Sequence, residues 1–346
     1  MKKIMIFGAG SLGNHLTNAG LKHGYEVYIT DKSDKALSRM KKKLFKKRYG
    51  YWSEHINLIK TKEINGIFDT KFEIVIIGTP PETHLMLYDF CKKNLNYKKI
   101  LIEKPLCVYS QKINKFAKND YIFCGYNHSV SPSIKYFLNL LTQNKINYLF
   151  SSIKWKEGWA GILNAHYWLK DEFSSYLGNI EKGGGAIHEH SHPIHLAVII
   201  LKSLSNKNIK VENSNLLFKK KKKIKYDYFA NILLNSDKNK INVEIDLVEP
   251  GSKKEITIYF KNKIIRWIHN YSDSNDAVII YYKNKKKLKL FKKKRETEFI
   301  EEIKHIEDIK NSKEYLLSPL NVNHGINVMK IINKVLFNEN LLRHRN

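Results

Sequence analysis

The sequence predicts an α/β protein with two domains, a doubly wound parallel sheet followed by an α+β domain with an open antiparallel sheet. The chain has 346 residues, which is enough for two domains of ordinary size. Up to residue 125, short apolar runs alternate with helical stretches, as in a parallel sheet covered on both faces. Beyond residue 210, apolar and polar residues alternate within each run, as in a sheet with one exposed face.

The first domain is expected to span residues 1–125, and the second to span residues 126–346. In the first domain the β-rich runs are apolar and uninterrupted. The expected strands are 3–7, 26–30, 73–78, 99–103 and 121–125. The expected helices are 12–23, 33–48, 82–95 and 108–118.

The second domain is expected to open with a helix near 132–143 and a strand near 148–155. An irregular aromatic segment follows, and a helix is predicted from the glycines at 183–185 to about Leu204. Turn signals such as Pro250-Gly251 then separate several short alternating runs. The expected strands are 226–234, 241–248, 255–260, 264–269 and 278–283. Helical periodicity returns at 296–311 and 320–337.

Composition restricts the class of protein. A hydrophobic content of 42% suits a folded core, and no apolar stretch approaches the ~20 residues of a membrane span, so no membrane partner is expected. The three cysteines are odd in number and lack the spacing of metal ligands, which indicates reduced thiols in a cytoplasmic protein. They are Cys91, Cys107 and Cys124.

The net charge is strongly positive, at +28. The lysines are spread over the whole chain, so they predict a solvated basic surface and no specific nucleic-acid partner. A positive field of this kind steers an anionic substrate towards its pocket.

A glycine motif lies at the start of the chain. Gly8, Gly10 and Gly13 form G-x-G-x-x-G between an apolar run and a helical stretch. The first glycine allows a tight turn, the second lets the backbone approach a pyrophosphate, and the third lets helix and strand pack closely. The residues between them complete the candidate cofactor contacts: Ala9, Ser11 and Leu12. This context predicts a dinucleotide-binding Rossmann domain, and a glycine-rich turn without a ligand is the alternative.

An acidic residue stands where a ribose would bind. Asp31 follows Gly13 by 18 residues, at the end of the second apolar run. Its carboxylate accepts hydrogen bonds from an adenosine ribose and repels a 2′-phosphate, so NAD is the expected cofactor. The neighbouring cation Lys32 leaves NADP open.

Two further motifs end predicted strands. Thr79, Pro80 and His84 belong to Thr-Pro-Pro-x-x-x-His, which opens a helix at the edge where doubly wound sheets bind ligands. Glu103 and Lys104 begin Glu-Lys-Pro after the next strand, and a lysine there can polarise a substrate hydroxyl or carbonyl. Taken singly, these motifs also fit an ordinary helix entry and a surface Glu-Lys pair.

The order and spacing of these motifs resemble those of the Gfo/Idh/MocA oxidoreductases (glucose–fructose oxidoreductase, inositol dehydrogenase and relatives). The resemblance covers nearly the whole chain, up to Pro319–Leu336, which is similar to that family's closing helix. It implies a two-domain dehydrogenase with the nicotinamide between the domains. It also implies that Lys104 hydrogen-bonds the reacting hydroxyl or carbonyl.

The family's substrate helix has a counterpart after the triple glycine. Glu189 takes the place usually held by an Asp, His192 aligns with the family histidine, and His195 stands where another Asp is common. The segment resembles the subgroup in which Ser-His follows the acidic position by two residues. His192 is the candidate proton relay, since a neutral imidazole suits that role near pH 7. Lys104, His192 and Glu189 are the candidate catalytic residues.

The same segment also contains a literal H-E-x-x-H. On a helix, His188 and His192 could bind zinc with Glu189 as general base, and Glu212 is a conceivable third ligand. Pro193 argues that 188–192 is at most a first helical turn. A zinc hydrolase is therefore the least favoured alternative, and no metal is expected.

Aromatic and polar residues near the expected domain junction suit a sugar. Asn127 and His128 follow the last strand of the first domain, and His166 and Tyr167 precede the glycine helix. With Lys104, His188 and His192, they are the candidate substrate-binding residues.

The resulting prediction is an NAD(P)-dependent oxidoreductase that acts on a hydroxyl or keto group of a sugar, cyclitol or nucleotide sugar. The positive charge favours a nucleotide sugar, used in building surface glycans. A non-catalytic cofactor-binding protein is the alternative, because Glu189 and His195 depart from the family pattern. A homodimer or homotetramer is expected through the strands between 226 and 283, since an open sheet leaves a face to be covered. Candidate contacts, some of which must belong to the core, are Phe229, Ile245, Tyr259 and Trp267.

Overall fold

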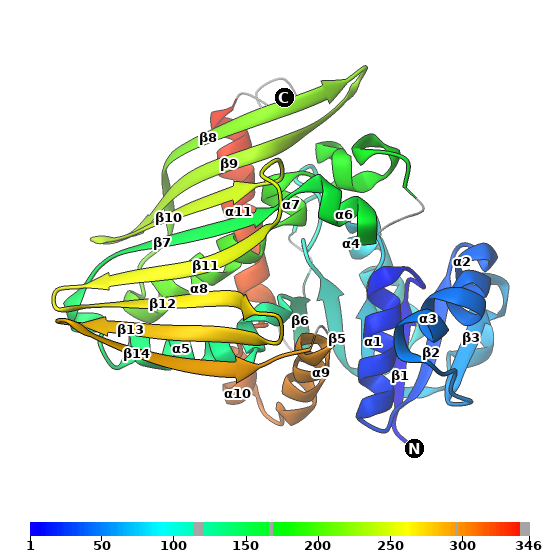
Figure 1. Ribbon diagram of the computed structural model, residues 1–346. Coiled ribbons are helices and arrows are strands. Elements are labelled where there is room, and N and C mark those ends of the chain that lie inside the picture. Colours follow the sequence, from blue (N-terminus) through cyan, green and yellow to red (C-terminus); the bar gives the residue numbers. More distant parts are fainter. Residues whose placement is uncertain (114–115, 117–120, 166–168, 295, 340–346) are drawn as a thin grey trace. The chain divides into compact units, whose positions relative to one another are not determined.

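The computed structural model describes residues 1–339 apart from 114–115, 117–120, 166–168 and 295. Within that part, the chain divides into two compact units, each built on one sheet (Figure 1). The first unit comprises 1–107, 111–127 and 295–322, and the second comprises 108–110, 128–294 and the residues from 323 onward. Residues 295–322, which the sequence analysis assigned to the second domain, thus lie in the first unit.

The first unit contains a six-stranded parallel sheet with the order β3-β2-β1-β4-β5-β6. Its strands are β1 (Lys3–Phe7), β2 (Glu26–Asp31), β3 (Ile56–Lys60), β4 (Lys71–Ile77), β5 (Asn96–Glu103) and β6 (Tyr121–Gly125). In the central strand β1, the apolar residues Ile4, Met5 and Ile6 are completely buried. The strand order reverses between β1 and β4, which is where doubly wound sheets bind dinucleotides.

Helices flank this sheet. They are α1 (Ser11–Lys22), α2 (Asp34–Arg39), α3 (Phe45–Tyr49), α4 (His84–Asn94), α9 (Thr297–Asp308) and α10 (Ser312–Leu317), with a π-helical turn at Met40–Leu44. On α1, His15 stacks on Phe299 of α9 with the ring centroids 4.8 Å apart. The helix expected at 108–118 is absent over 108–113, where Val108 and Tyr109 are buried in a turn. The burial of these two side chains in the turn and the weak helix propensity of valine and tyrosine both oppose a helix there.

The second unit contains an eight-stranded sheet with the order β14-β13-β12-β11-β7-β10-β9-β8 (Figure 1). Its strands are β7 (Tyr148–Glu157), β8 (Lys210–Lys221), β9 (Ile224–Ser236), β10 (Asn239–Asp246), β11 (Ser252–Phe260), β12 (Lys263–Ser272), β13 (Asn275–Tyr282) and β14 (Lys285–Lys292). All neighbours pair antiparallel except β7 and β10. The two-sheet architecture predicted from the sequence is confirmed.

One face of this sheet forms the core of the second unit. The helices of the unit are α5 (Pro132–Thr142), α6 (Trp159–Ala165), α7 (Ala186–Glu189), α8 (His192–Leu204) and α11 (Val322–Asn338). Helices α5 and α8 pack on the inner face, where Trp267 donates a hydrogen bond to Ser133 Oγ of α5 over 2.9 Å. Ile245 and Trp267 are fully buried on this face, and Tyr259 lies on the opposite face, 39% exposed.

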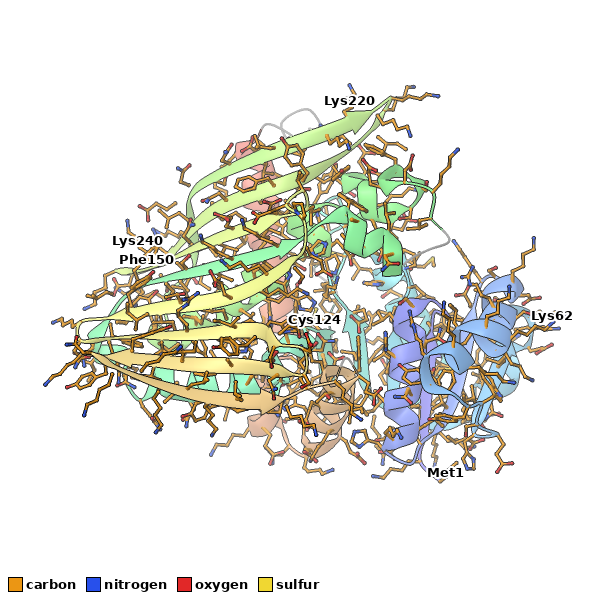
Figure 2. The ribbon with its side chains drawn as sticks, in the orientation of Figure 1. Met1, Lys62, Cys124, Phe150, Lys220 and Lys240 are labelled. Atoms are coloured by element: carbon orange, nitrogen blue, oxygen red, sulfur yellow. The ribbon has the colours of Figure 1, made fainter. Side chains whose placement is uncertain are left out.

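Lysines concentrate at the margins of the same sheet. The runs Lys219–Lys223 and Lys285–Lys287 lie on its edge strands, β8 and β14, and at the ends of those strands. Figure 2 shows Lys220 at the projecting end of the β8–β9 hairpin. Charged edge strands oppose edge-to-edge pairing with other chains. Over the described ranges, the chain has no helix with the length and apolar character needed to cross a membrane.

Candidate active site

The glycine turn after β1 has the shape that a dinucleotide requires. Gly8 has φ +107°, and a Cβ on it would lie 2.6 Å from the carbonyl oxygen of Gly78, so the turn passes close to the end of β4. A Cβ on Gly10, in contrast, would meet no described atom within 4 Å. Helix α1 begins at Ser11 without a side-chain cap. Open space beside uncapped helical N–H groups fits a pyrophosphate.

Asp31 is fixed at the end of β2. Its Oδ2 accepts a hydrogen bond from the backbone N–H of Ala9 over 2.9 Å, and its Oδ1 accepts one from Ser33 over 2.8 Å. The carboxylate is therefore tied to the glycine turn, next to where an adenosine ribose would bind. Lys32 beside it is exposed.

Arg48 contacts the glycine turn at the start of α1, and sequence reasoning missed this contact. From α3 its guanidinium donates to both the carbonyl oxygen and the Oγ of Ser11, each over 2.7 Å. It brings positive charge to the end of α1 that faces the pyrophosphate position. The residue sits in a run of basic side chains, so no pattern in the sequence distinguishes it from solvated lysines.

The two loops that follow β4 and β5 are joined by His84. Its Nε2 lies 2.7 Å from the carbonyl oxygen of Thr79, and its Nδ1 lies 3.1 Å from that of Pro105. Burial lowers the pKa of His84 to about 4, so the ring is neutral near pH 7. A neutral imidazole has one N–H, so it donates to only one of the two carbonyl oxygens, and that of Thr79 is the nearer. This geometry indicates that His84 holds the Thr79–Pro80 loop rather than reaching a ligand itself.

Glu103 is buried at the end of β5, next to Gly125 of β6 and the backbone of Lys104. Its carboxylate accepts from the backbone N–H of Lys104 over 3.3 Å, and a Cβ on Gly125 would fall 2.5 Å from it. Helix α9 supplies the fully buried Glu302, whose pKa is raised by burial and then by the carboxylates of Glu103 and Glu298. Sequence reasoning missed Glu302 because nearly two hundred residues separate it from Glu103.

In the second unit, aromatic rings surround His192 at the start of α8. The ring of His192 stacks on Trp155 with centroids 5.8 Å apart, and His128 approaches it edge-on at 4.6 Å. His269 of β12 contacts the other side of His128 at 5.3 Å. Two predicted site histidines, His128 and His192, are therefore brought together, and Trp155 and His269 join them.

A charged pair borders this cluster. Glu157 forms an ion pair with Lys254 over 2.8 Å and lies 3.7 Å from Nδ1 of His190. Burial alone would raise the pKa of Glu157, but Lys254 and His190 hold it well below the usual value. The ammonium of Lys254 also lies 4.9 Å above the ring of Trp155.

His188 is among the most deeply buried of the predicted site residues. It is fully buried on α7, burial lowers its pKa to about 3, and its ring lies 5.9 Å from that of Tyr109. Neither ring nitrogen has a hydrogen-bond partner among the residues that the structure describes. Two buried, neutral ring nitrogens of this kind suit a polar ligand. On the same helix, Glu189 accepts from the hydroxyl of Tyr176 over 3.4 Å.

The H-E-x-x-H segment does not lie on one helix. Helix α7 ends at Glu189 and α8 begins at His192, with a break between them. The zinc motif needs both histidines one turn apart on a continuous helix. This geometry does not favour the zinc alternative.

Of the remaining predicted substrate residues, the structure describes Asn127 and His128, which belong to different units. Asn127 is buried in the 3₁₀ turn Asn127–Val130 and belongs to the first unit, whereas His128 belongs to the second. His166 and Tyr167 lie outside the described residues.

Comparison with known proteins gives a likeness of fold. No protein-family model matches the chain, and no curated protein matches its sequence. A 3-ketoreductase from Actinomadura kijaniata, KijD10, solved with NADP and TDP-benzene, has a TM-score of 0.72 at 12% identity, with 97% of each chain covered. UDP-N-acetylglucosamine 3-dehydrogenase GnnA from Acidithiobacillus ferrooxidans has a TM-score of 0.65 at 12% identity, with 96% of each chain covered. A levoglucosan dehydrogenase solved with NADH and L-sorbose has a TM-score of 0.69 at 13% identity, covering 99% of this chain and 97% of that one. The chain therefore shares the complete two-sheet architecture of these proteins.

Proposed function

We propose that this protein is an NAD(P)-dependent oxidoreductase that acts on a hydroxyl or keto group of a sugar, cyclitol or nucleotide sugar. The observation that carries the proposal is the arrangement at one edge of the parallel sheet. The glycine turn follows β1, Asp31 ends β2, Thr79 follows β4, and Lys104 follows β5. Because the strands are parallel, these groups share the carboxyl edge, which is the ligand-binding edge of doubly wound sheets.

The structural relatives support the substrate class. Their names describe a 3-ketoreductase, a UDP-N-acetylglucosamine dehydrogenase and a levoglucosan dehydrogenase, solved in part with NADP or NADH. The net charge of +28 also favours an anionic substrate such as a nucleotide sugar. For such a substrate, we propose a role in building surface glycans.

Each proposed residue role follows from side-chain chemistry. When bound, the nicotinamide exchanges hydride with the substrate carbon. Lys104 donates a hydrogen bond to the reacting oxygen, and His192 takes that oxygen's proton during oxidation. Trp155 holds the imidazole of His192 in place by stacking. His188 offers its two buried nitrogens to substrate hydroxyls.

A panel of substrates tests the reaction. Purified protein is mixed with NAD or NADP and with free sugars, cyclitols and nucleotide sugars, and reduced cofactor is followed by absorbance. We expect reduction with at least one nucleotide sugar. Cofactor binding without turnover across the panel would instead favour the non-catalytic alternative.

We expect a preference for NAD(H) that depends on Asp31. The fixed carboxylate repels a 2′-phosphate, so Asp31→Ser should shift the ratio of NADH to NADPH affinities towards NADPH by about tenfold or more. Asp34→Ser, three residues along and exposed, is the matched control and should leave the ratio unchanged. Tighter binding of NADPH by the unmodified protein would mean that Lys32 dominates the choice.

We also propose that the protein forms a homodimer or homotetramer through the outer face of the eight-stranded sheet. This face has a hollow of about 390 Å³ whose lining residues include Tyr259, Ile264 and Tyr281, with the ion pair Glu255–Arg266 across it at 2.8 Å. Phe150, marked in Figure 2, is paired with Tyr259 on the same face. The lysine runs lie on the edge strands, so their repulsion falls at the rim.

Light scattering at physiological salt tests the assembly. Tyr259→Lys places a charge at the centre of the proposed interface and should yield a monomer. Tyr282→Lys is the control, because Tyr282 is 43% exposed and alternates to the opposite face from Tyr281. A monomeric mass for the unmodified protein at micromolar concentration would rule the interface out.

We further propose that the protein works in the cytoplasm. The three cysteines are free and buried, and burial raises the pKa of the Cys107 thiol to about 12. Such thiols are unreactive and need no oxidising compartment.

A further inference from the structure

The three glycines before α7 form a turn that leaves the start of that helix without its own cap. Gly185 precedes the helix with φ +88°, and the N–H groups of Gly184 and Gly185 donate to the carbonyls of Asn179 and Leu177, each over 2.9 Å. A helix normally receives a side-chain oxygen at this position, because its first N–H groups have no internal partner. Glycine cannot supply that oxygen.

A distant aspartate supplies it instead. Asp227 on β9 is fully buried, and its Oδ2 accepts a hydrogen bond from the backbone N–H of Ile187 over 2.8 Å. A Cβ on Gly185 would lie 2.1 Å from Oδ1 of the same carboxyl group. Glycine at 185 is therefore needed to admit Asp227, and Asp227 is needed to cap the helix that follows.

We propose that Asp227 is a positioning residue that fixes the orientation of the segment His188–His192. From Ile187 the chain continues through a short series of local hydrogen bonds: Glu189 N–H donates to Gly185 over 3.1 Å, and Ser191 N–H donates to His188 over 3.2 Å. The contact at Ile187 thus sets the direction in which α7 and the first residue of α8 leave the glycine turn. The role of Asp227 in turnover rests on the proposed function, but its role in holding this segment does not.

The charge state of Asp227 distinguishes it from an ordinary cap. Burial raises its pKa to about 8, against the opposing effect of backbone N–H groups that include those of Ile187 and Ala186. The titratable or charged side chains on the elements that pack against β9 fall into four groups: on α7 and α8, His188, Glu189, His192, His195 and Lys202; on the short helices within 176–182, Tyr176, Glu181 and Lys182; on β8, Lys210, Glu212, Lys219, Lys220 and Lys221; and on β10, Lys240, Glu244 and Asp246. Lys219 and Lys221 are paired with Glu172 and Asp171. Burial, rather than any of these charges, accounts for the direction of the shift.

The sign of the pH dependence follows. The folded-state pKa of Asp227 lies above the value of about 3.9 in an unfolded chain, so the folded state binds more protons between pH 4 and pH 8. The free energy of unfolding therefore falls as the pH rises through this window, and it levels off above it. At neutral pH the carboxyl group is mostly protonated, and its hydrogen bond to Ile187 is that of a neutral acceptor.

Two substitutions, Asp227→Asn and Asp227→Ala, distinguish the hydrogen bond that caps α7 from the ionisation of the carboxyl group. The asparagine keeps a neutral oxygen for Ile187 and cannot ionise, so its Tm should exceed that of the unmodified protein by an amount that grows from pH 5 to pH 8. The alanine loses the acceptor, so amide hydrogen exchange over residues 186–192 should be about tenfold or more faster at pH 7. Exchange in α1 should not change in either variant. Asp246→Asn is the matched control, because Asp246 caps a turn on the neighbouring strand through Val248 and Glu249.

Each result decides one part of the proposal. If the Asp227→Asn variant protects the amides of residues 186–192 from exchange as well as the unmodified protein does, and its Tm depends less on pH, both the cap and the titration are supported. If the amides of residues 186–192 exchange as fast in the Asp227→Asn variant as in the Asp227→Ala variant, the cap is overturned. If the Tm of the Asp227→Asn variant depends on pH as strongly as that of the unmodified protein, the titration is overturned. If the alanine variant does not fold, the asparagine variant still decides. Because these measurements need neither substrate nor cofactor, a failure here is distinct from a failure of the proposed activity.

Discussion

Gly10→Ala is expected to weaken cofactor binding by at least about tenfold while leaving the fold intact. The added methyl group meets no described protein atom within 4 Å, so the free energy of unfolding should change little. The same methyl group occupies the space through which a pyrophosphate would approach the backbone. We expect the Kd for NADH and NADPH to rise by at least about tenfold, or ~1.4 kcal/mol, in a fluorescence titration.

Gly66→Ala is the matched control for this substitution. Gly66 lies in the same unit, and a Cβ on it also meets nothing within 4 Å, but it belongs to the 3₁₀ helix Thr61–Ile67 and not to the glycine turn. The Gly66→Ala variant should bind NADH and NADPH as tightly as the unmodified protein does. Equal affinity in the Gly10 variant as well would show that the pyrophosphate does not bind at this turn.

Lys104→Met is expected to have the largest effect on turnover. Loss of the ammonium removes the hydrogen bond to the reacting oxygen, and we expect kcat to fall by about 10²–10⁴-fold. The contact between Glu103 and residue 104 uses the backbone N–H, which methionine keeps, so the loop should hold its shape. The measurement is steady-state kinetics on the substrate that the panel identifies.

Lys98→Met provides the comparison, since Lys98 lies on β5, the strand that Lys104 follows, and is exposed and paired with Glu73. Its kcat should stay within about twofold of the unmodified value, because surface ion pairs contribute little. Cofactor affinity should survive in both variants. A Lys104 variant that keeps full kcat would remove Lys104 from the proposed chemistry.

The fold was largely predictable because its strands follow simple periodic patterns. The central strands of the first unit are continuous apolar runs, and those of the second alternate, as covered and half-exposed sheets require. The edge strands β8 and β14 escaped individual prediction. Their lysine-rich sequences bury few side chains, and their pairing comes from the neighbouring strand rather than from hydrophobic pattern.

The site was predictable only where local motifs carry it. Glycine turns and strand-end residues such as Asp31 and Lys104 can be found from order and spacing along the chain. Arg48, Glu302 and Asp227 act through contacts between segments far apart in sequence, and a single sequence has no local signal for such contacts. The same holds for His269, which reaches the ring of His128 from a distant strand.

A fluorescence titration of the unmodified protein with NADH and NADPH tests the central claim most directly. Transfer of the nicotinamide from water into a protein site changes its emission, so the readout needs no knowledge of the substrate. We predict saturable binding of at least one of the two cofactors, with NADH the tighter and with Kd well below ~1 mM. Absence of binding by both cofactors up to millimolar concentration would contradict the account.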